Sequence, residues 1–515
     1  MQLHHLKDRR TQRASAYLTV FYQLTLGLIL LIGLAGCQNP APDNDLPTAT
    51  PTRKPGSTPL PLSTGLPTLE ESPSSDLPPT ATPPPQLSKL GLQDSDLHRV
   101  AIQFWHPWGG EEGALLGEII EEFNLANPWK IQVETRAFEG FGRLEEAVAA
   151  SARDRLFPDV LVGYNYQAAG WDGGGTMLAD LDDYTDDAKW GLTDEEKADF
   201  YPIFWSQDVI SVTSQTGSGS ESKRMGIPFH RLGLVIFYNQ SWAEELGYST
   251  PPDTPFNFRL QACAAAEDSN RDTNPDNNNS GLIVTANPSA MLGWIYAYGG
   301  DVIQPEGKGY QFATPEAERA LDFLKGLQDY HCTWSFNGVD AAAEFAARRG
   351  LFYIDTPASL PALRAAFKAA GNEDTWTVIP FPSAADGAVM NAFGPSLLMP
   401  RSTSEEQLAA WLLIKWLVDP QNQARWVQGG YFLPTRASSL EYLDSALGSD
   451  PLYEQAIELL PYSRSEPAYA SWSEVRWALL DLQKELLSAD FDAEEMPDLL
   501  ENLDQIALEI HTQMQ

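Results

Sequence analysis

Aromatic residues occur in several predicted turns of this chain, close to short polar and charged residues. Trp108 and Tyr431 lie in turns rich in glycine or proline, where a bulky ring is less naturally buried in a core. Tyr164 follows a run of apolar residues typical of a buried strand. Flat rings beside hydrogen-bonding groups suit a ligand with apolar C–H faces and many hydroxyls, such as a sugar. These residues are therefore candidates for ligand contacts.

Polar candidates for the same site follow predicted strands. His230 and Arg231 come directly after one apolar strand, and Asp355 follows another. Donors at the first place can reach ligand hydroxyls or a carboxylate, and Asp355 can accept from paired hydroxyls. Arg436 is a further candidate, or it simply closes a turn. Each residue alone can equally be a solvated or salt-bridged surface group, so the prediction depends on their combination.

The sequence contains no common catalytic motif. No Gly-x-Ser-x-Gly elbow, Walker loop or His-Glu-x-x-His pattern occurs. Two carboxylates in an aromatic cleft would suffice for a glycosidase, and the 70 acidic residues leave that alternative open. On these residues alone, a binding protein without a cofactor and a membrane-anchored glycoside hydrolase both remain open; the expectation that the chain is not an enzyme comes from the family resemblance described below.

One segment is similar to the start of a calcium-binding loop. Asp268, Asn270 and Asp272 alternate as the first ligands of such a loop do. The sixth position is Thr273 instead of glycine, and the twelfth is Asn279 instead of glutamate. The histidines of the chain are also widely scattered. We expect a solvated loop and no metal site.

Length and charge exclude several classes of protein. A chain of 515 residues is too long for one compact domain. Its formal net charge of −36 repels phosphate backbones, so nucleic acid is not expected as a partner. The 15 Trp, 18 Tyr and 22 Phe can build large cores, which excludes a wholly disordered chain.

The N-terminus has the pattern of an export signal. Basic residues precede an apolar stretch from Ala16 to Leu34, which ends in Leu34-Ala35-Gly36-Cys37. This ending resembles the lipobox of bacterial lipoproteins, so residues 1–36 are predicted to be a lipoprotein signal peptide. The resemblance implies a lipid on Cys37 that anchors the chain to the cell membrane, on the outside of the cytoplasm. A single transmembrane anchor is the alternative.

Residues 37–97 are predicted to be a tether. There are 14 prolines and no aromatic residue between Gln38 and Leu90, so this segment cannot bury a core. We interpret it as a spacer between the lipid anchor and the folded part, which is expected to begin at residue 98.

Strands and helices alternate at the start of the expected folded part. The predicted order is a strand at 100–105, a helix with an apolar face from Leu115 to Phe123, a strand at 131–133, a helix at 144–152 and a strand at 158–162. This order implies an α/β fold with a parallel sheet. Ligands of such sheets bind beyond the carboxyl ends of the strands, which brings Trp108 and Tyr164 to the same edge.

Further along the chain, local signals indicate helix starts and loops. Thr193 with Glu196, and Thr403 with Glu406, form capping-box patterns. Pro315 suits the first turn of another helix. The segments 211–222, rich in Ser and Gly, and 268–281, rich in Asn and Asp, are expected to be surface loops.

The order of segments from about Val100 to Glu485 resembles the extracellular solute-binding proteins of ABC importers, in particular the sugar-binding group that includes maltose-binding protein. Each landmark is a short pattern, and their order along the chain carries the resemblance. The landmarks include Phe104-Trp105, Pro158-Asp159-Val160, Gly226-Ile227-Pro228-Phe229, Phe237-Tyr238-Asn239, Gly299-Gly300, and Gly430-Tyr431-Phe432-Leu433-Pro434-Thr435-Arg436.

The resemblance implies a two-lobe periplasmic-binding-protein type II fold with a ligand cleft between the lobes. The chain is expected to cross the hinge three times, near Phe229, Pro380 and Pro420. The expected lobes are residues 98–229 with 380–419, and residues 230–379 with 420–515. Trp294 and Trp472 then lie where the family forms its cleft, although core packing is an equal alternative for each.

The function implied by the resemblance is that of a monomeric substrate-binding subunit, which captures a mono- or oligosaccharide and delivers it to the transmembrane subunits of an ABC permease. Some members of the family take glycerol phosphodiesters instead. Arg231 and Arg436 keep that alternative open, because a phosphodiester needs cationic groups.

Two cysteines remain once Cys37 is assigned to the lipid. Cys263 and Cys332 lie in helical stretches that are expected to belong to the same lobe. Outside the cytoplasm a pair of cysteines usually bonds. We therefore predict a disulfide between them.

Overall fold

The computed structural model describes residues 88–153, 156–173, 175–213, 220–270, 280–385 and 387–514. The predicted signal peptide, Cys37, most of the predicted tether and most of the loop compared with a calcium site lie outside these residues. The described residues belong to a compact unit that begins at Thr82. None of their helices is both long and apolar enough to cross a membrane.

Ordered contacts begin before the expected start at residue 98. The Asp187 carboxylate accepts hydrogen bonds from the Ser88 hydroxyl at 2.9 Å and from the Lys89 backbone N–H at 2.8 Å. Leu97, at the end of the 3₁₀ helix Asp94–Leu97, is fully buried. The last residues assigned to the tether therefore belong to the folded unit.

The first sheet has five strands in the order β2-β1-β3-β13-β6. These are β1 (Ala101–His106), β2 (Gln132–Ala137), β3 (Val160–Tyr164), β6 (Gly226–Pro228) and β13 (Pro395–Leu398). β1 pairs in parallel with both β2 and β3, and β13 runs antiparallel to β3. The predicted α/β unit with a parallel sheet is confirmed.

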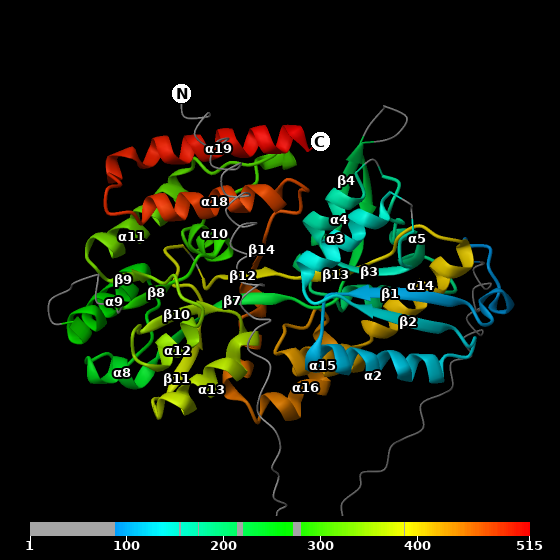
Figure 1. Ribbon diagram of the computed structural model, residues 1–515, viewed down its shortest axis with the longest axis horizontal. Helices are drawn as coiled ribbons and strands as arrows, with labels where there is room; N and C mark the ends of the chain where they lie inside the picture. The colour runs from blue at the N-terminus through cyan, green and yellow to red at the C-terminus, as the bar shows by residue number, and fades with distance from the viewer. Residues whose placement is uncertain are drawn as a thin grey trace, which may run out of the picture. The chain divides into compact units, whose positions relative to one another are not determined.

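Helices lie on both faces of this sheet. In Figure 1, α3 (Phe141–Ser151) and α4 (Asn165–Trp171) lie on one side of β1 and β3, and α2 (Gly110–Ala126) and α15 (Pro420–Gly430) lie on the other. The apolar stripe of α2 is buried as its 3.6-residue periodicity predicts, with Leu116, Ile119, Ile120 and Phe123 facing the core.

Several helix starts occur where local signals predicted them. Thr193 caps α6 (Asp194–Ala198) and Thr403 caps α14 (Ser404–Leu417), each with its capping box formed. Thr314 caps α11 (Pro315–Asp329). Further short helices are α5 (Asp182–Thr185), α7 (Pro202–Gln207), α8 (Gln240–Glu245), α16 (Leu440–Leu447) and α17 (Pro451–Glu458).

The second sheet has seven strands, with the main order β14-β12-β7-β10-β8-β9 and β11 paired to β7. These are β7 (Leu232–Asn239), β8 (Leu282–Val284), β9 (Thr333–Ser335), β10 (Phe352–Asp355), β11 (Trp376–Ile379), β12 (Met390–Phe393) and β14 (Ser463–Ser465). α10 (Pro288–Ala297), α11, α18 (Trp472–Leu486) and α19 (Met496–Gln513) lie on one side, and α12 (Ala341–Ala346) and α13 (Leu360–Ala370) on the other (Figure 1).

Two crossings between the sheets lie side by side. The chain passes from β6 to β7 through Phe229–Arg231, near the expected first crossing, and from β12 to β13 through Gly394. A Cβ on Gly394 would stand 2.6 Å from the His230 carbonyl oxygen, so only glycine fits where the two segments meet.

The other expected lobe boundaries differ from the strand pairing. β12 lies within the stretch 380–419 assigned to the first lobe, yet it pairs with β7 and β14 of the second sheet. α15, which was assigned to the second lobe, packs against α2 of the first lobe. The chain reaches the second lobe later than expected, at α17, which packs on β11. An apolar pattern predicts that an element is buried, but it does not indicate in which lobe, because both lobes offer an apolar surface.

Two expected loops are partly regular. β4 (Val209–Thr213) and β5 (Ser220–Arg224) pair as an antiparallel hairpin, so both ends of the predicted loop 211–222 are strands. α9 (Pro255–Asn270) continues into the predicted loop 268–281. The predicted disulfide is present, and it joins Cys263 of α9 to Cys332, directly before β9.

Candidate functional site

The carboxyl ends of β1 and β3 place aromatic residues side by side. The rings of Trp108, Phe141 and Tyr164 follow one another, with centroids 6.4 and 4.7 Å apart. Tyr166 continues the row, stacked on Tyr164 with centroids 5.5 Å apart and an angle of 14° between the rings. We call these four residues the aromatic row. They form a continuous aromatic surface at the edge of the first sheet, in which Tyr164 and Tyr166 are nearly parallel and Trp108 and Phe141 are nearly perpendicular.

The aromatic row lies there because of parallel pairing. β1 and β3 run side by side, so the residues that follow them emerge at the same edge of the sheet. Phe141, at the start of α3, and Tyr166, in the first turn of α4, were not predicted from the sequence. The run Tyr164-Asn165-Tyr166 after an apolar strand is the signal that would have indicated the second.

A polar network faces this region from the second sheet. Glu466 accepts from the Trp472 indole N–H at 2.8 Å and from the Asn391 amide at 3.2 Å. The same Asn391 amide donates to the Ser289 carbonyl at 2.8 Å. The network therefore ties β12, α10 and α18 together around one buried carboxylate.

Arg476 connects the two sides. Its Nη1 donates to the Tyr166 hydroxyl at 3.0 Å, so a side chain of α18 contacts α4 of the first lobe. Burial raises the pKa of Tyr164, and the charges of Arg476 and Glu466 act on it in opposite directions. The aromatic row, Arg476 and Glu466 thus share one electrostatic environment.

Several buried polar atoms in this region have no hydrogen-bond partner among the described residues. From the first lobe these are Asn165 Nδ2 and His106 Nδ1, and from the second lobe Ser289 Oγ, Asn391 Oδ1, Ser465 Oγ and Arg476 Nε. An unpaired buried polar atom costs about 1–3 kcal/mol, so such groups are rare unless something else binds them. Both lobes therefore contribute buried polar atoms that have no partner among the described residues.

His230 and Arg231, predicted to bind ligand, lie in packed surroundings. His230 accepts from the Trp426 indole N–H at 3.0 Å and stacks on Phe432 with centroids 4.1 Å apart. Arg231 is fully buried. Its side chain donates to groups of the first lobe, namely Gln207, Asp208, the Pro395 carbonyl and Ser396.

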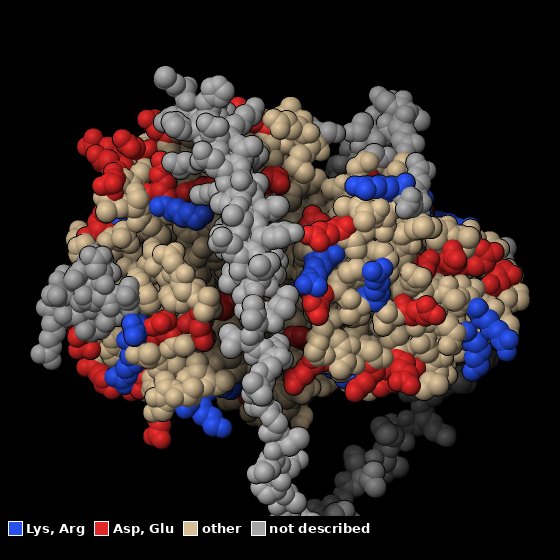
Figure 2. Space-filling model, viewed as in Figure 1, with Lys and Arg blue, Asp and Glu red and all other residues tan. Residues whose placement is uncertain are grey.

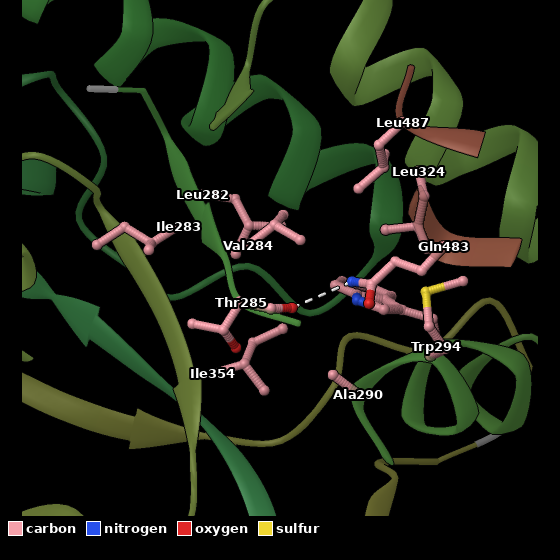
Figure 3. A pocket seen from close by; sticks show the side chains of 11 residues that line it. Leu282, Ile283, Val284, Thr285, Ala290, Trp294, Leu324, Ile354, Gln483 and Leu487 are labelled. Atoms are coloured by element: carbon pink, nitrogen blue, oxygen red, sulfur yellow. Dashed lines mark hydrogen bonds between the residues drawn. The ribbon is translucent and has the colours of Figure 1, made fainter. Parts of the chain in front are cut away.

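Trp294 lies in the core of the second lobe, not on a surface that faces the first. Its ring contacts Phe258, Phe323 and Phe381. It also lines a small apolar cavity of about 20 Å³ between β8, α10 and α18 (Figure 3). There the Gln483 amide donates to the Thr285 carbonyl at 3.2 Å. Every residue of α10 is buried, so Trp294 and Tyr296 are both part of the core.

Trp472 lies near the polar network, and Asp355 lies at the end of β10. Trp472 is fully buried, so its bond to Glu466 makes it a support for the network. Asp355 accepts from the Tyr353 hydroxyl, and burial raises its pKa.

Tyr431 and Arg436 are engaged by side chains outside the polar network. Tyr431 ends α15 in the left-handed conformation, and its hydroxyl accepts from Arg364 of α13 at 3.1 Å. Arg436 forms an ion pair with Asp199 at 2.6 Å. Both arginines named by the sequence are thus neutralised by carboxylates, Arg231 by Asp208 and Arg436 by Asp199.

His106 provides a test of burial at this edge. Burial lowers its pKa from 6.5 to about 4. Between pH 4 and 6.5, the unfolded chain therefore binds more protons at His106 than the folded chain does. Because of this difference, the contribution of neutral His106 to the free energy of unfolding is complete above about pH 6.5 and is lost as the pH falls toward 4. When the pH is lowered from 7.5 to 4.5, the free energy of unfolding measured in urea should fall by on the order of 2 kcal/mol more for the native protein than for the His106→Gln variant. An equal pH dependence of the two proteins would contradict this.

Comparison with protein families identifies the chain. Residues 118–455 match the model of the bacterial extracellular solute-binding proteins. The chain belongs to this family. The family is extracellular, so this solute-binding protein works outside the cytoplasm. No curated protein sequence matches it.

Solved structures share the two-lobe fold of this solute-binding protein. A cyclic α-maltosyl-1,6-maltose binding protein from Arthrobacter globiformis is similar with a TM-score of 0.67 and 18% identity, over 80% of this chain and 99% of that one. The sugar-binding protein MalE from Xanthomonas citri has a TM-score of 0.67 and 20% identity, over 80% and 98%. UgpB from Mycobacterium tuberculosis, solved with glycerophosphocholine, has a TM-score of 0.62 and 18% identity, over 80% and 98%.

Proposed function

We propose that this chain is the substrate-binding component of an ABC importer, and that it captures a mono- or oligosaccharide between its two lobes for delivery to a membrane permease. The observation that carries the proposal is the pairing of the aromatic row with unpaired buried polar atoms from both lobes. Rings bind the C–H faces of a sugar, and the polar atoms bind its hydroxyls. Several proteins of the same fold are described as binding maltose-type sugars, which supports the same ligand class.

A phosphodiester is the second candidate, since UgpB was solved with glycerophosphocholine. The charges of this chain favour the sugar. Arg231 and Arg436 are engaged by Asp208 and Asp199, so Arg476 is the cation that faces the aromatic row. Figure 2 shows scattered patches of Asp and Glu that outnumber those of Lys and Arg on the visible face. The net charge of −36 disfavours anionic ligands.

The finer assignments belong to the same proposal. The chain is not an enzyme, it acts as a monomer, and a lipid on Cys37 anchors it to the membrane through the Pro-rich tether. Of the residues named from the sequence, Trp108 and Tyr164 are ligand contacts, Trp472 and Arg231 support the site, and Asp355 stands at its margin.

A ligand screen tests the proposal directly. A thermal-shift screen of the full-length protein against neutral sugars and glycerophosphodiesters should give its largest rise in melting temperature with a sugar. Product analysis should recover that sugar unchanged. A cleaved sugar would instead mean a glycosidase, and a rise with phosphodiesters alone would replace the ligand class.

The sugar that stabilises the protein should bind more weakly when the aromatic row is interrupted. Tyr164→Ala removes the central ring of the row, and we expect calorimetry to show a loss of about tenfold to a hundredfold in affinity. Tyr442→Ala is the matched control, because Tyr442 is 55% exposed on α16 and far along the chain from the row. Equal affinities for the two variants would place the ligand elsewhere.

A further inference from the structure

A second group of aromatic and polar side chains lies at the outer edge of the second sheet. β9 is the edge strand, and the chain leaves it through an exposed loop that ends at the start of α12. Trp334 of β9 and Phe336 of the loop are half-buried, with ring centroids 5.4 Å apart and nearly perpendicular planes. A Cβ on Gly338 would stand 2.4 Å from the Phe336 ring, so the glycine lets the loop fold closely over that ring.

These rings line a depression that is open to solvent and has a volume of about 320 Å³. The remaining lining residues are Ser335, Asn337 and Gly338 from the loop, and Glu344 and Arg349 from α12 and the turn after it. Arg349 Nε and Glu344 Oε2 are 2.9 Å apart, and both side chains remain partly exposed. The volume lies within the range of small-molecule sites, and the ion pair leaves the lining without net charge.

We propose that this depression is a second carbohydrate site, which takes one or two neutral sugar units. Trp334 and Phe336 pack partly against the core, and the parts of their rings that remain exposed provide apolar surface for C–H groups. The Asn337 amide, the Ser335 hydroxyl and the Glu344–Arg349 pair provide donors and acceptors for neighbouring hydroxyls. A charged sugar or a phosphate finds no unpaired cation here, because Glu344 already neutralises Arg349.

The second site is separate from the region between the lobes. β12, which carries Asn391, lies at the other side of the sheet, with β7, β10 and β8 between it and β9. At about 4.8 Å between neighbouring strands, the two strands are roughly 19 Å apart. The two sites therefore do not share residues, and the inference goes beyond the function proposed above.

A glycan array with neutral gluco-, manno-, galacto- and xylo-oligosaccharides tests the second site in the full-length protein. The cleft variant Tyr164→Ala should keep its binding to a subset of these glycans. Adding Trp334→Ala or Phe336→Ala should weaken that remaining binding about tenfold or more, the scale of losing one central contact. Adding Phe256→Ala, which removes a ring that is 58% exposed on α9, should leave it unchanged.

Two results would overturn the second site. One is a cleft variant that binds no glycan, and the other is remaining binding that Trp334→Ala and Phe336→Ala leave intact. Arg349→Ala and Asn337→Ala keep both rings, so they should weaken binding at an unchanged melting temperature if the site is real. If the proposed site between the lobes were wrong and the second site right, the result would differ. Tyr164→Ala would then leave all glycan binding unchanged, and Trp334→Ala would remove it.

Discussion

Replacing Asp208 with asparagine should lower the free energy of unfolding by about 3–5 kcal/mol, the usual cost of leaving a buried charge without its partner. Asp208 and Arg231 are both almost fully buried, and their charged groups are 3.4 Å apart. Asp208 also accepts from the Ser396 hydroxyl at 2.7 Å. The substitution keeps the shape of the side chain and leaves the guanidinium uncompensated.

The position of this pair explains why a large effect is expected. Arg231 lies where the chain crosses from β6 to β7, and its backbone N–H donates to the Leu433 carbonyl at 3.0 Å. Ser396 belongs to β13, which follows the second crossing. The pair therefore holds both crossing segments and α7 in register.

Urea unfolding of Asp208→Asn, of Arg231→Met and of the double variant measures the coupling. The double variant should recover much of the loss, since it buries no lone charge. Glu139→Gln is the control, because its ion pair with Arg143 is exposed and should contribute little. Additive losses in the double variant would show that the two side chains act independently.

Removing the disulfide should cost about 4 kcal/mol of stability. Cys263 and Cys332 are 69 residues apart, so the bond closes a long loop and restricts the unfolded chain strongly. Cys332 is 1% exposed, which protects the bond from reductants while the protein is folded. We expect the Cys263→Ala/Cys332→Ala variant to melt at a lower temperature than the native protein.

Melting curves with and without reductant check this origin of the effect. The double variant should melt at the same temperature in both conditions, and the native protein should fall toward that temperature only when it is unfolded in the presence of reductant. A native protein as labile as the variant under oxidising conditions would mean that the bond contributes nothing.

Local patterns predicted the elements of the first lobe well. The alternation of apolar residues gave β1, α2, β2, α3 and β3 in the right order, because helix and strand periodicity depend on neighbours in the sequence. The capping boxes at Thr193 and Thr403 formed for the same reason. Parallel pairing of β1 with β3 then brought Trp108 and Tyr164 to one edge.

Local sequence patterns could not predict which groups surround each side chain. Arg231, Trp294 and Trp472 are types that bind ligands when exposed, yet each is buried here. Their partners, such as Asp208, Phe381 and Glu466, lie in other elements. Phe141 and Tyr166 joined the aromatic row without having been predicted; the run Tyr164-Asn165-Tyr166 is a signal for Tyr166, whereas nothing near Phe141 in the sequence indicates which rings it meets.

The sequence by itself determined the α/β class, the family and the disulfide partners, because these follow from composition, the order of short patterns and the number of cysteines. The tertiary structure decided which lobe receives β12 and α15, and which buried polar atoms have no partner among the described residues. The physical reason is that burial and hydrogen bonding at one residue depend on segments that are distant in sequence. Only the fold brings those segments into contact.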